Sequence, residues 1–262
     1  LKANLSRVNK ALVANDYGAA IRELDRLIAT APKNLSELVK TKSEILLAAK
    51  RYDEAQAIFE EALASRELTW ARLGLGKVLF WRKQYPQAQQ VFAHLLAQDP
   101  NMIAAYDWLA RTQAAQQCFP EAEKTLQDAA NLSPRALPRQ QMLGELALSN
   151  GHSETAEQAF GRAVALAKHS VLSSPALFSG LARSKSANGK HVEALKVIGD
   201  MGKAFAKDPG AACYAAAATA CVKQGQGDLE GAAQALHSAE QSLAERGAAH
   251  TSGRMLEMVK ND

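Results

Sequence analysis

Histidine and cysteine are the residues best suited to metal binding or nucleophilic chemistry, and their spacing in this chain favours neither. No two of the six histidines are four residues apart, the spacing that sets two zinc ligands on one face of a helix. Cys118, Cys213 and Cys221 form no closely spaced metal motif, and no base for a thiol nucleophile can be identified. We therefore expect no metal, no cofactor and no catalytic residue.

One glycine-rich stretch, Leu73-Gly74-Leu75-Gly76, invites comparison with a phosphate-binding loop. Such a loop follows a strand, and no convincing strand is predicted anywhere in the chain. The stretch lies instead in a helical pattern in which Gly76 occupies a small-residue position. We therefore expect these glycines to serve helix packing.

Seven short segments of the chain resemble one another, and a shared alanine anchors each of them. The steps between the alanines are 35, 33, 34, 34, 38 and 38 residues, within the range of stacked helix pairs. This regularity predicts a repeat array, for which binding is the default function. The alanines are Ala20, Ala55, Ala88, Ala122, Ala156, Ala194 and Ala232.

Each anchor lies in a recurring frame with a helical period of three to four residues. In the second segment an aromatic residue, Tyr52, precedes Ala55, and the apolar residues Phe59 and Ala62 follow it. A Leu-Gly or Leu-Ala step lies twelve or thirteen residues upstream of most anchors. A proline lies twelve residues downstream of three of them, at Pro32, Pro100 and Pro134, and the second unit has Arg66 or Glu67 in its place. Small residues let two helices approach closely, and the proline ends a helix pair.

This pattern resembles the tetratricopeptide repeat, which pairs a Leu-Gly step in its first helix with Ala, Phe and Ala in its second and Pro at its end. The resemblance implies an all-α, right-handed superhelical solenoid of about seven helix pairs over residues 1–249. We expect the tail, 250–262, to form a capping helix, with an exposed dimer contact, and hence a homodimer, as the alternative. The expected units are 1–34, 36–68, 69–102, 103–136, 137–174, 175–212 and 213–249.

Composition limits the classes of partner and the location. The 31 basic and 27 acidic side chains nearly balance, and no basic run stands out, so we expect no nucleic acid. No apolar stretch reaches the roughly 18 to 20 residues that a membrane helix needs. The N-terminus has neither an initiator Met nor a signal-peptide core, which suggests a cut end. The unpaired cysteines favour a reducing cytoplasm.

The first helices of such a solenoid expose a concave face on which a partner peptide or protein can lie. Counting from the Leu-Gly steps predicts which side chains face this groove. They are Glu37, Lys40, Glu44, Trp70, Lys77, Trp81, Asp107, Arg111, Gln141, Glu145 and Arg183.

Several of these residues also fit a packing role. Trp70 and Trp81 are either apolar anchors for a partner or plugs between consecutive helix pairs. Asp107 and Arg111 are four residues apart, so they pair with each other or together favour a partner of mixed charge. Trp108 is expected to face a neighbouring helix.

One use of the tetratricopeptide fold can be tested directly on residues. Chaperone-tail receptors hold a carboxylate with Lys and Asn, then Asn, then Lys and Arg over three consecutive repeats. The corresponding places here hold Lys40 and Glu44, then Gly74, then Ala104 and Trp108. Only Lys40 matches, so this reading is not favoured.

A narrower resemblance concerns Trp70–Gly74, Ala105–Ala110 and Leu132–Arg135, which are similar to the repeat region of bacterial response regulators that carry an N-terminal receiver domain. No receiver pattern lies in this chain. The resemblance implies that the chain is the output half of a two-component signalling protein.

Together these features predict a non-enzymatic, cytoplasmic scaffold that binds a protein partner, as the output region of a response regulator. The first alternative is a stand-alone adaptor or assembly factor for an envelope or secretion complex. An enzyme or phosphatase built on repeats would need a catalytic acid or amide that the sequence does not reveal.

Overall fold

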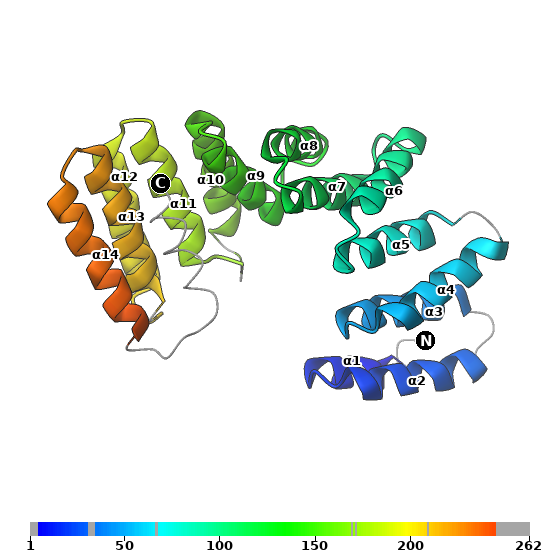
Figure 1. Cartoon of the computed structure of the whole chain (residues 1–262). Coiled ribbons are helices and arrows are strands. Elements are labelled where there is room, and N and C mark those ends of the chain that lie inside the picture. Colours follow the sequence, from blue (N-terminus) through cyan, green and yellow to red (C-terminus); the bar gives the residue numbers. More distant parts are fainter. Residues whose placement is uncertain are drawn as a thin grey trace. The chain divides into compact units, whose positions relative to one another are not determined.

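A computed structural model describes residues 5–30, 35–65, 68–168, 170, 172–208 and 210–244 of the 262-residue chain. These residues form fourteen α-helices and no strand (Figure 1). The chain divides into two compact units, Leu1–Cys118 and Phe119–Asp262. The prediction of an all-α repeat solenoid is confirmed, and each unit is described separately below.

Unit 1 (Leu1–Cys118) contains seven helices in which each helix packs on the next along the chain. α5 also packs between α3 and α7, so these three first helices of consecutive pairs form one layer. The helices are α1 (Ser6–Val13), α2 (Tyr17–Thr30), α3 (Leu35–Ala48), α4 (Tyr52–Ser65), α5 (Thr69–Trp81), α6 (Tyr85–Gln98) and α7 (Ile103–Ala115).

Unit 2 (Phe119–Asp262) contains seven more helices, and α11 packs against both α9 and α13. Connections 168–174 and 205–210 are longer than connections 99–102 and 133–136, and α10 and α13 are longer than α8 and α9. Together these differences account for the longer steps between the late anchor alanines. The helices are α8 (Phe119–Leu132), α9 (Leu137–Ser149), α10 (Ser153–Ala167), α11 (Pro175–Ala187), α12 (His191–Ala204), α13 (Ala211–Gly225) and α14 (Leu229–Ala244).

The same turn joins the two helices of every pair. One residue in each turn has a positive φ. The N–H of the residue that follows it donates a hydrogen bond to the carbonyl oxygen five residues earlier in the chain, the Schellman arrangement. The steps between these residues are the same as those between the anchor alanines, which are all buried. The seven-fold repeat is therefore present in the backbone. The positive-φ residues are Asn15, Lys50, Lys83, Gln117, Gly151, Gly189 and Gly227.

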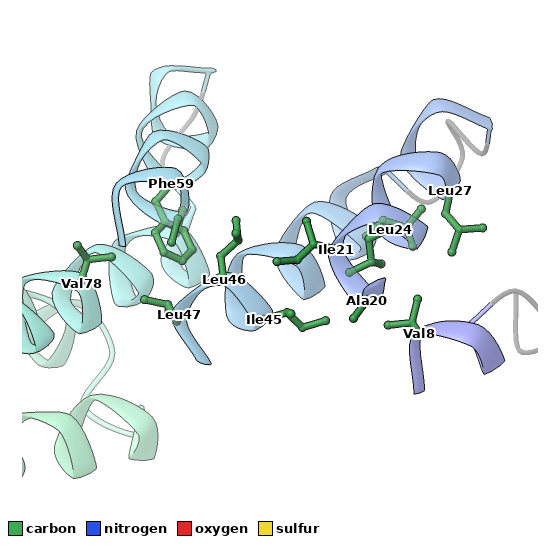
Figure 2. Close-up of a cluster of buried hydrophobic side chains, with 13 residues drawn as sticks. Val8, Ala20, Ile21, Leu24, Leu27, Ile45, Leu46, Leu47, Phe59 and Val78 are labelled. Carbon is green, nitrogen blue, oxygen red and sulfur yellow. The ribbon is translucent and has the colours of Figure 1, made fainter. Parts of the chain in front are cut away.

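The core is built from phenylalanines of the second helices placed against glycines of the first helices. Phe59 of α4 is fully buried against Gly74 of α5, and Figure 2 shows it within the apolar cluster of unit 1. In unit 2, Phe160 of α10 lies between Gly144 of α9 and Gly180 of α11. A Cβ atom at these glycines would overlap the aromatic ring. The expectation that Gly74 and Gly76 serve packing is confirmed.

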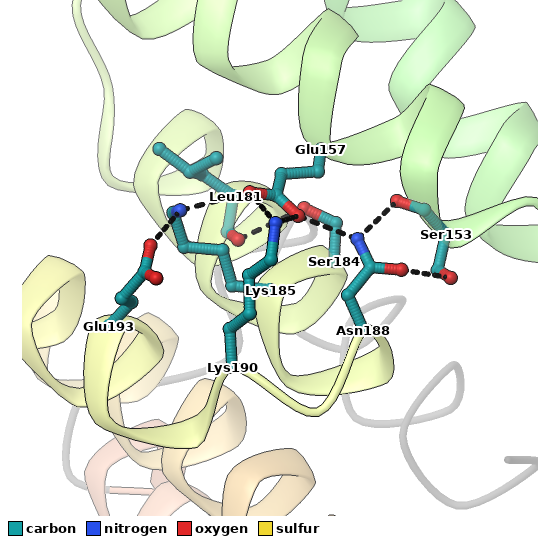
Figure 3. Close-up of polar contacts among 8 residues, drawn as sticks. All are labelled: Ser153, Glu157, Leu181, Ser184, Lys185, Asn188, Lys190 and Glu193. Carbon is teal, nitrogen blue, oxygen red and sulfur yellow. Dashed lines mark hydrogen bonds and ion pairs between the residues drawn. The ribbon is translucent and has the colours of Figure 1, made fainter.

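A polar contact recurs between consecutive pairs inside each unit. The residue after the anchor alanine forms a hydrogen bond with the residue that immediately follows the next first helix. The donor–acceptor distances are 2.5 Å for Arg82 to Gln56, 2.6 Å for Gln116 to Gln89, 2.5 Å for Asn150 to Glu123 and 2.6 Å for Asn188 to Glu157. Figure 3 shows the last of these contacts.

Some expectations lie outside the described residues. These include the capping helix at 250–262, Pro32, and Arg66 with Glu67, where the second unit lacks the usual proline. Among the residues that the structure describes, no helix is both long enough and apolar enough to cross a membrane.

Candidate partner-binding groove

A groove with a volume of about 370 Å³ lies in unit 1, over α3, α5, α7 and the turn between α3 and α4. α5 carries its middle, because α5 packs between α3 and α7. Both polar and aromatic side chains reach it. The lining residues are Glu44, Leu47, Ala48, Lys50, Tyr52, Lys77, Trp81, Trp108 and Arg111.

Two tryptophans give the groove its apolar surface. Trp81, the last residue of α5, is 48% exposed although it is a large apolar side chain. Its ring lies edge-on to Trp108 of α7, with ring centroids 6.2 Å apart. Trp108 in turn stacks on Phe92 at 6.2 Å and meets Phe80 edge-on at 5.4 Å. The inner aromatic residues therefore fix Trp108 in place, while Trp81 remains open to solvent.

Three cations and one carboxylate line the same groove. Lys77 Nζ donates a hydrogen bond of 2.8 Å to Glu44 Oε1, and its side chain is only 14% exposed. The same Nζ lies 5.8 Å from the Trp108 ring centroid. The Arg111 guanidinium lies over the Trp108 ring at 5.2 Å, a cation–π arrangement. Among the described residues, neither Arg111 nor Lys50 forms an ion pair.

The structure thus gathers four of the predicted site residues into one groove: Glu44, Lys77, Trp81 and Arg111. Glu37 and Lys40 are exposed on α3 but do not line it. Trp70 packs on Phe59, with ring centroids 6.0 Å apart, and lies outside the groove.

Asp107 of α7 does not line the groove either.

Five lining residues were not predicted, namely Leu47, Ala48, Lys50, Tyr52 and Trp108, and Trp108 is the largest of them. It was expected to face a neighbouring helix, and it does contact Phe92 of α6, yet it also lines the groove. The available signal was its position. Trp108 precedes Ala122 by fourteen residues, as Gly74 precedes Ala88, so a bulky ring occupies the place of a glycine. A side chain of that size extends beyond the helix contact.

The remaining predicted residues lie in unit 2. Gln141 Nε2 donates a hydrogen bond of 2.8 Å to Glu145 Oε1 on the next turn of α9. Solvent reaches Glu145, yet desolvation by the crowded surroundings raises the pKa of its carboxyl, against the opposing effects of Gln141 and Arg183. Arg183 of α11 lines a separate hollow of about 350 Å³ together with Leu148.

Chemistry-bearing residues do not gather into a reactive site in the described part of the chain. No group of three or more His, Cys, Asp or Glu side chains there has the geometry to hold a metal ion. His152 Nδ1 lies 2.8 Å from Glu123 Oε2, which also accepts a hydrogen bond from Asn150. These hydrogen bonds link α8, α9 and α10 to one another, so we assign the cluster a structural role.

Comparisons with known proteins agree with the architecture. The sequence model of the tetratricopeptide repeat family matches residues 46–107, which include most of the groove. The match covers the last part of α3, all of α4, α5 and α6, and the start of α7. No curated protein sequence matches the chain.

Several solved structures share the fold at low sequence identity. A tetratricopeptide repeat protein from Parabacteroides merdae is 16% identical with a TM-score of 0.56, and the alignment covers 99% of this chain and 98% of that one. YrrB, described as a tetratricopeptide repeat protein with an unusual peptide-binding site, is 17% identical with a TM-score of 0.58 over 78% and 98% of the two chains. PilW, described as a type IV pilus biogenesis factor, is 19% identical with a TM-score of 0.61 over 78% and 93%.

Proposed function

We propose that this chain is a non-enzymatic protein-interaction scaffold that holds a segment of a partner protein in the groove of unit 1. The observation that carries the proposal is the exposed Trp81 beside the cation–π pair of Trp108 and Arg111. A large aromatic side chain left open to water next to a fixed cation is typical of an interface anchor.

The arrangement of the helices supports the same function. The groove runs across three first helices of consecutive repeats, so a segment lying in it can contact each of them. YrrB, whose fold is similar, is described as having a peptide-binding site, and that description belongs to YrrB alone. The proposal for this chain rests on the groove.

Site-specific photo-crosslinking tests the proposal. A photoreactive amino acid replaces Ala48, which is exposed and lines the groove, and the protein is irradiated in a lysate of its natural host. The matched control carries the same amino acid at Ala165, which is exposed on α10 of unit 2. We expect a discrete crosslinked protein from position 48 that Trp81→Ala abolishes. Identical products from both positions would contradict the proposal.

For the finer role we propose that the chain is the output region of a bacterial response regulator and acts in the cytoplasm. The support is the sequence resemblance of Trp70–Gly74, Ala105–Ala110 and Leu132–Arg135. Reading the natural coding sequence upstream of Leu1 tests this role. A receiver domain there directs the search to phosphorylation-dependent partners, whereas a start codon immediately before Leu1 rules the role out.

The alternative role is an adaptor for an envelope or secretion complex. The observation that favours it is the similarity in fold to PilW, which is described as a pilus biogenesis factor. Fractionation of cells that express the natural full-length protein separates the two roles. Recovery with the envelope supports the adaptor, and recovery in the cytoplasm supports the response-regulator output.

A further inference from the structure

We propose that the groove of unit 1 selects an internal partner segment in which acidic side chains flank a large apolar side chain. This inference rests on the proposed function, because it specifies what occupies the groove. Three features carry it: the charge of the lining, the fixed position of Arg111, and the order of the helices beneath the groove.

The charge of the lining favours an acidic partner. Lys77, Lys50 and Arg111 line the groove together with a single carboxylate, that of Glu44, and this carboxylate already accepts a hydrogen bond of 2.8 Å from Lys77. The Lys50 and Arg111 side chains form no ion pair among the described residues. Two cations are therefore left to bind carboxylates, and a basic segment would meet uncompensated like charge.

Arg111 is held ready for such a carboxylate. Its guanidinium lies over the Trp108 ring at 5.2 Å, and Phe80 and Phe92 hold that ring from the other helices. The contact with the ring involves the charge of the guanidinium and does not engage its N–H donors in hydrogen bonds, and the geometry of these donors matches that of a carboxylate. Because the side chain is already ordered, binding costs less conformational entropy.

The order of the helices places the two cations on different sides of the apolar surface. Lys50 follows α3, Arg111 lies on α7, and α5, which carries Trp81, packs between them. A segment crossing the groove therefore meets a cation, then the exposed Trp81 ring, then a second cation. A C-terminal carboxylate supplies only one such group, at the last residue, so the pattern fits an internal acidic–apolar–acidic sequence.

A displayed library of short random peptides, selected against the whole chain, tests this inference. Enriched peptides are synthesised, and their dissociation constants are measured for the wild type, Trp81→Ala, Arg111→Glu and the control Arg162→Glu. Arg162 is exposed on α10, so its variant carries the same charge change in unit 2. Each peptide is also prepared with an amidated C-terminus.

We expect the enriched peptides to share acidic residues on both sides of Leu, Phe or Trp. Arg111→Glu and Trp81→Ala should each weaken binding roughly tenfold or more, while Arg162→Glu and amidation change it little. Neutral or basic peptides whose binding is lost in Trp81→Ala would overturn the inference and leave the proposed function standing. Acidic peptides that bind all variants equally, or the absence of any enriched peptide, would count against both. A loss of binding on amidation would show that the groove takes a C-terminus instead.

Discussion

At the scale of single residues, the turns inside the helix pairs show how one Cβ atom can change the stability of the fold. Gly151 has φ +76°, a left-handed conformation in which a Cβ atom is strained, although nothing lies within 4 Å of the position such an atom would take. Gly161, in the interior of α10, also has open space around it but is helical. Neither position is crowded, so the two glycines differ only in backbone conformation. Replacing each by alanine therefore measures the effect of backbone strain without steric overlap.

We expect Gly151→Ala to destabilise the protein by about 1 kcal/mol, because alanine pays for the left-handed conformation. Gly161→Ala should stabilise it by up to roughly 1 kcal/mol, because alanine favours a helix interior. Urea unfolding followed by far-UV circular dichroism measures both changes. The same sign for the two variants would contradict this account.

Glu157 makes the stability of unit 2 depend on pH. Burial by itself raises its pKa, but hydrogen bonds from Asn188, Lys185 and Lys190 outweigh that effect and hold the pKa at about 2 (Figure 3). A carboxyl whose pKa is depressed in the folded state stabilises the fold above its unfolded pKa. That contribution is lost as the pH falls from about 4.5 towards 2.

The expected loss across that window is on the order of 2 kcal/mol in the free energy of unfolding. Glu157→Gln should remove this part of the pH dependence and lower the stability at neutral pH. The control Glu154→Gln, at an exposed carboxylate on the same helix, should keep the wild-type slope. Unfolding free energies at about pH 6 and about pH 3 decide the matter. Equal slopes for wild type and Glu157→Gln would contradict it.

At the scale of elements, contacts between second-helix phenylalanines and first-helix glycines set how closely the helices pack. Phe160 lies against Gly180 of the following pair, and no larger residue fits there without moving the ring. Gly180→Ala should therefore destabilise unit 2 by about 1–3 kcal/mol. Gly199→Ala, in open space on α12, is the matched control and should be neutral or stabilising. Thermal unfolding of the two variants measures the difference.

The elements also show where sequence reasoning succeeded and where it stopped. The alanine steps identified the helix pairs because they reflect the buried face of each second helix, and all seven alanines are buried. The positive φ at Lys50 and Lys83 left no signal, because lysine does not mark a left-handed turn. Counting predicted Trp81 and Arg111 as groove residues, and both line the groove of unit 1. The position of Trp108 where the preceding repeat has Gly74 indicates a change in side-chain size. Its contacts with Phe80 and Phe92 are set by packing among three helices, which local spacing does not encode.

At the scale of the whole chain, the division into two compact units predicts that their stabilities can be measured separately. All three tryptophans, Trp70, Trp81 and Trp108, belong to unit 1, so tryptophan fluorescence reports on that unit alone. Far-UV circular dichroism reports on both. In a repeat array each helix pair is stabilised mainly by its neighbours, so a destabilising substitution lowers mainly the stability of the unit that contains it.

Gly180→Ala should therefore move the circular dichroism transition of the whole chain to lower denaturant and broaden it, while the tryptophan transition stays near its wild-type midpoint. The matched variant in unit 1, Gly74→Ala, introduces a Cβ against Phe59 and should shift the tryptophan transition instead. Coincident shifts of both signals in both variants would mean that the chain unfolds as one cooperative body. In that case a partner bound in the unit 1 groove would stabilise all fourteen described helices against unfolding. If the two units unfold separately, binding stabilises unit 1 alone.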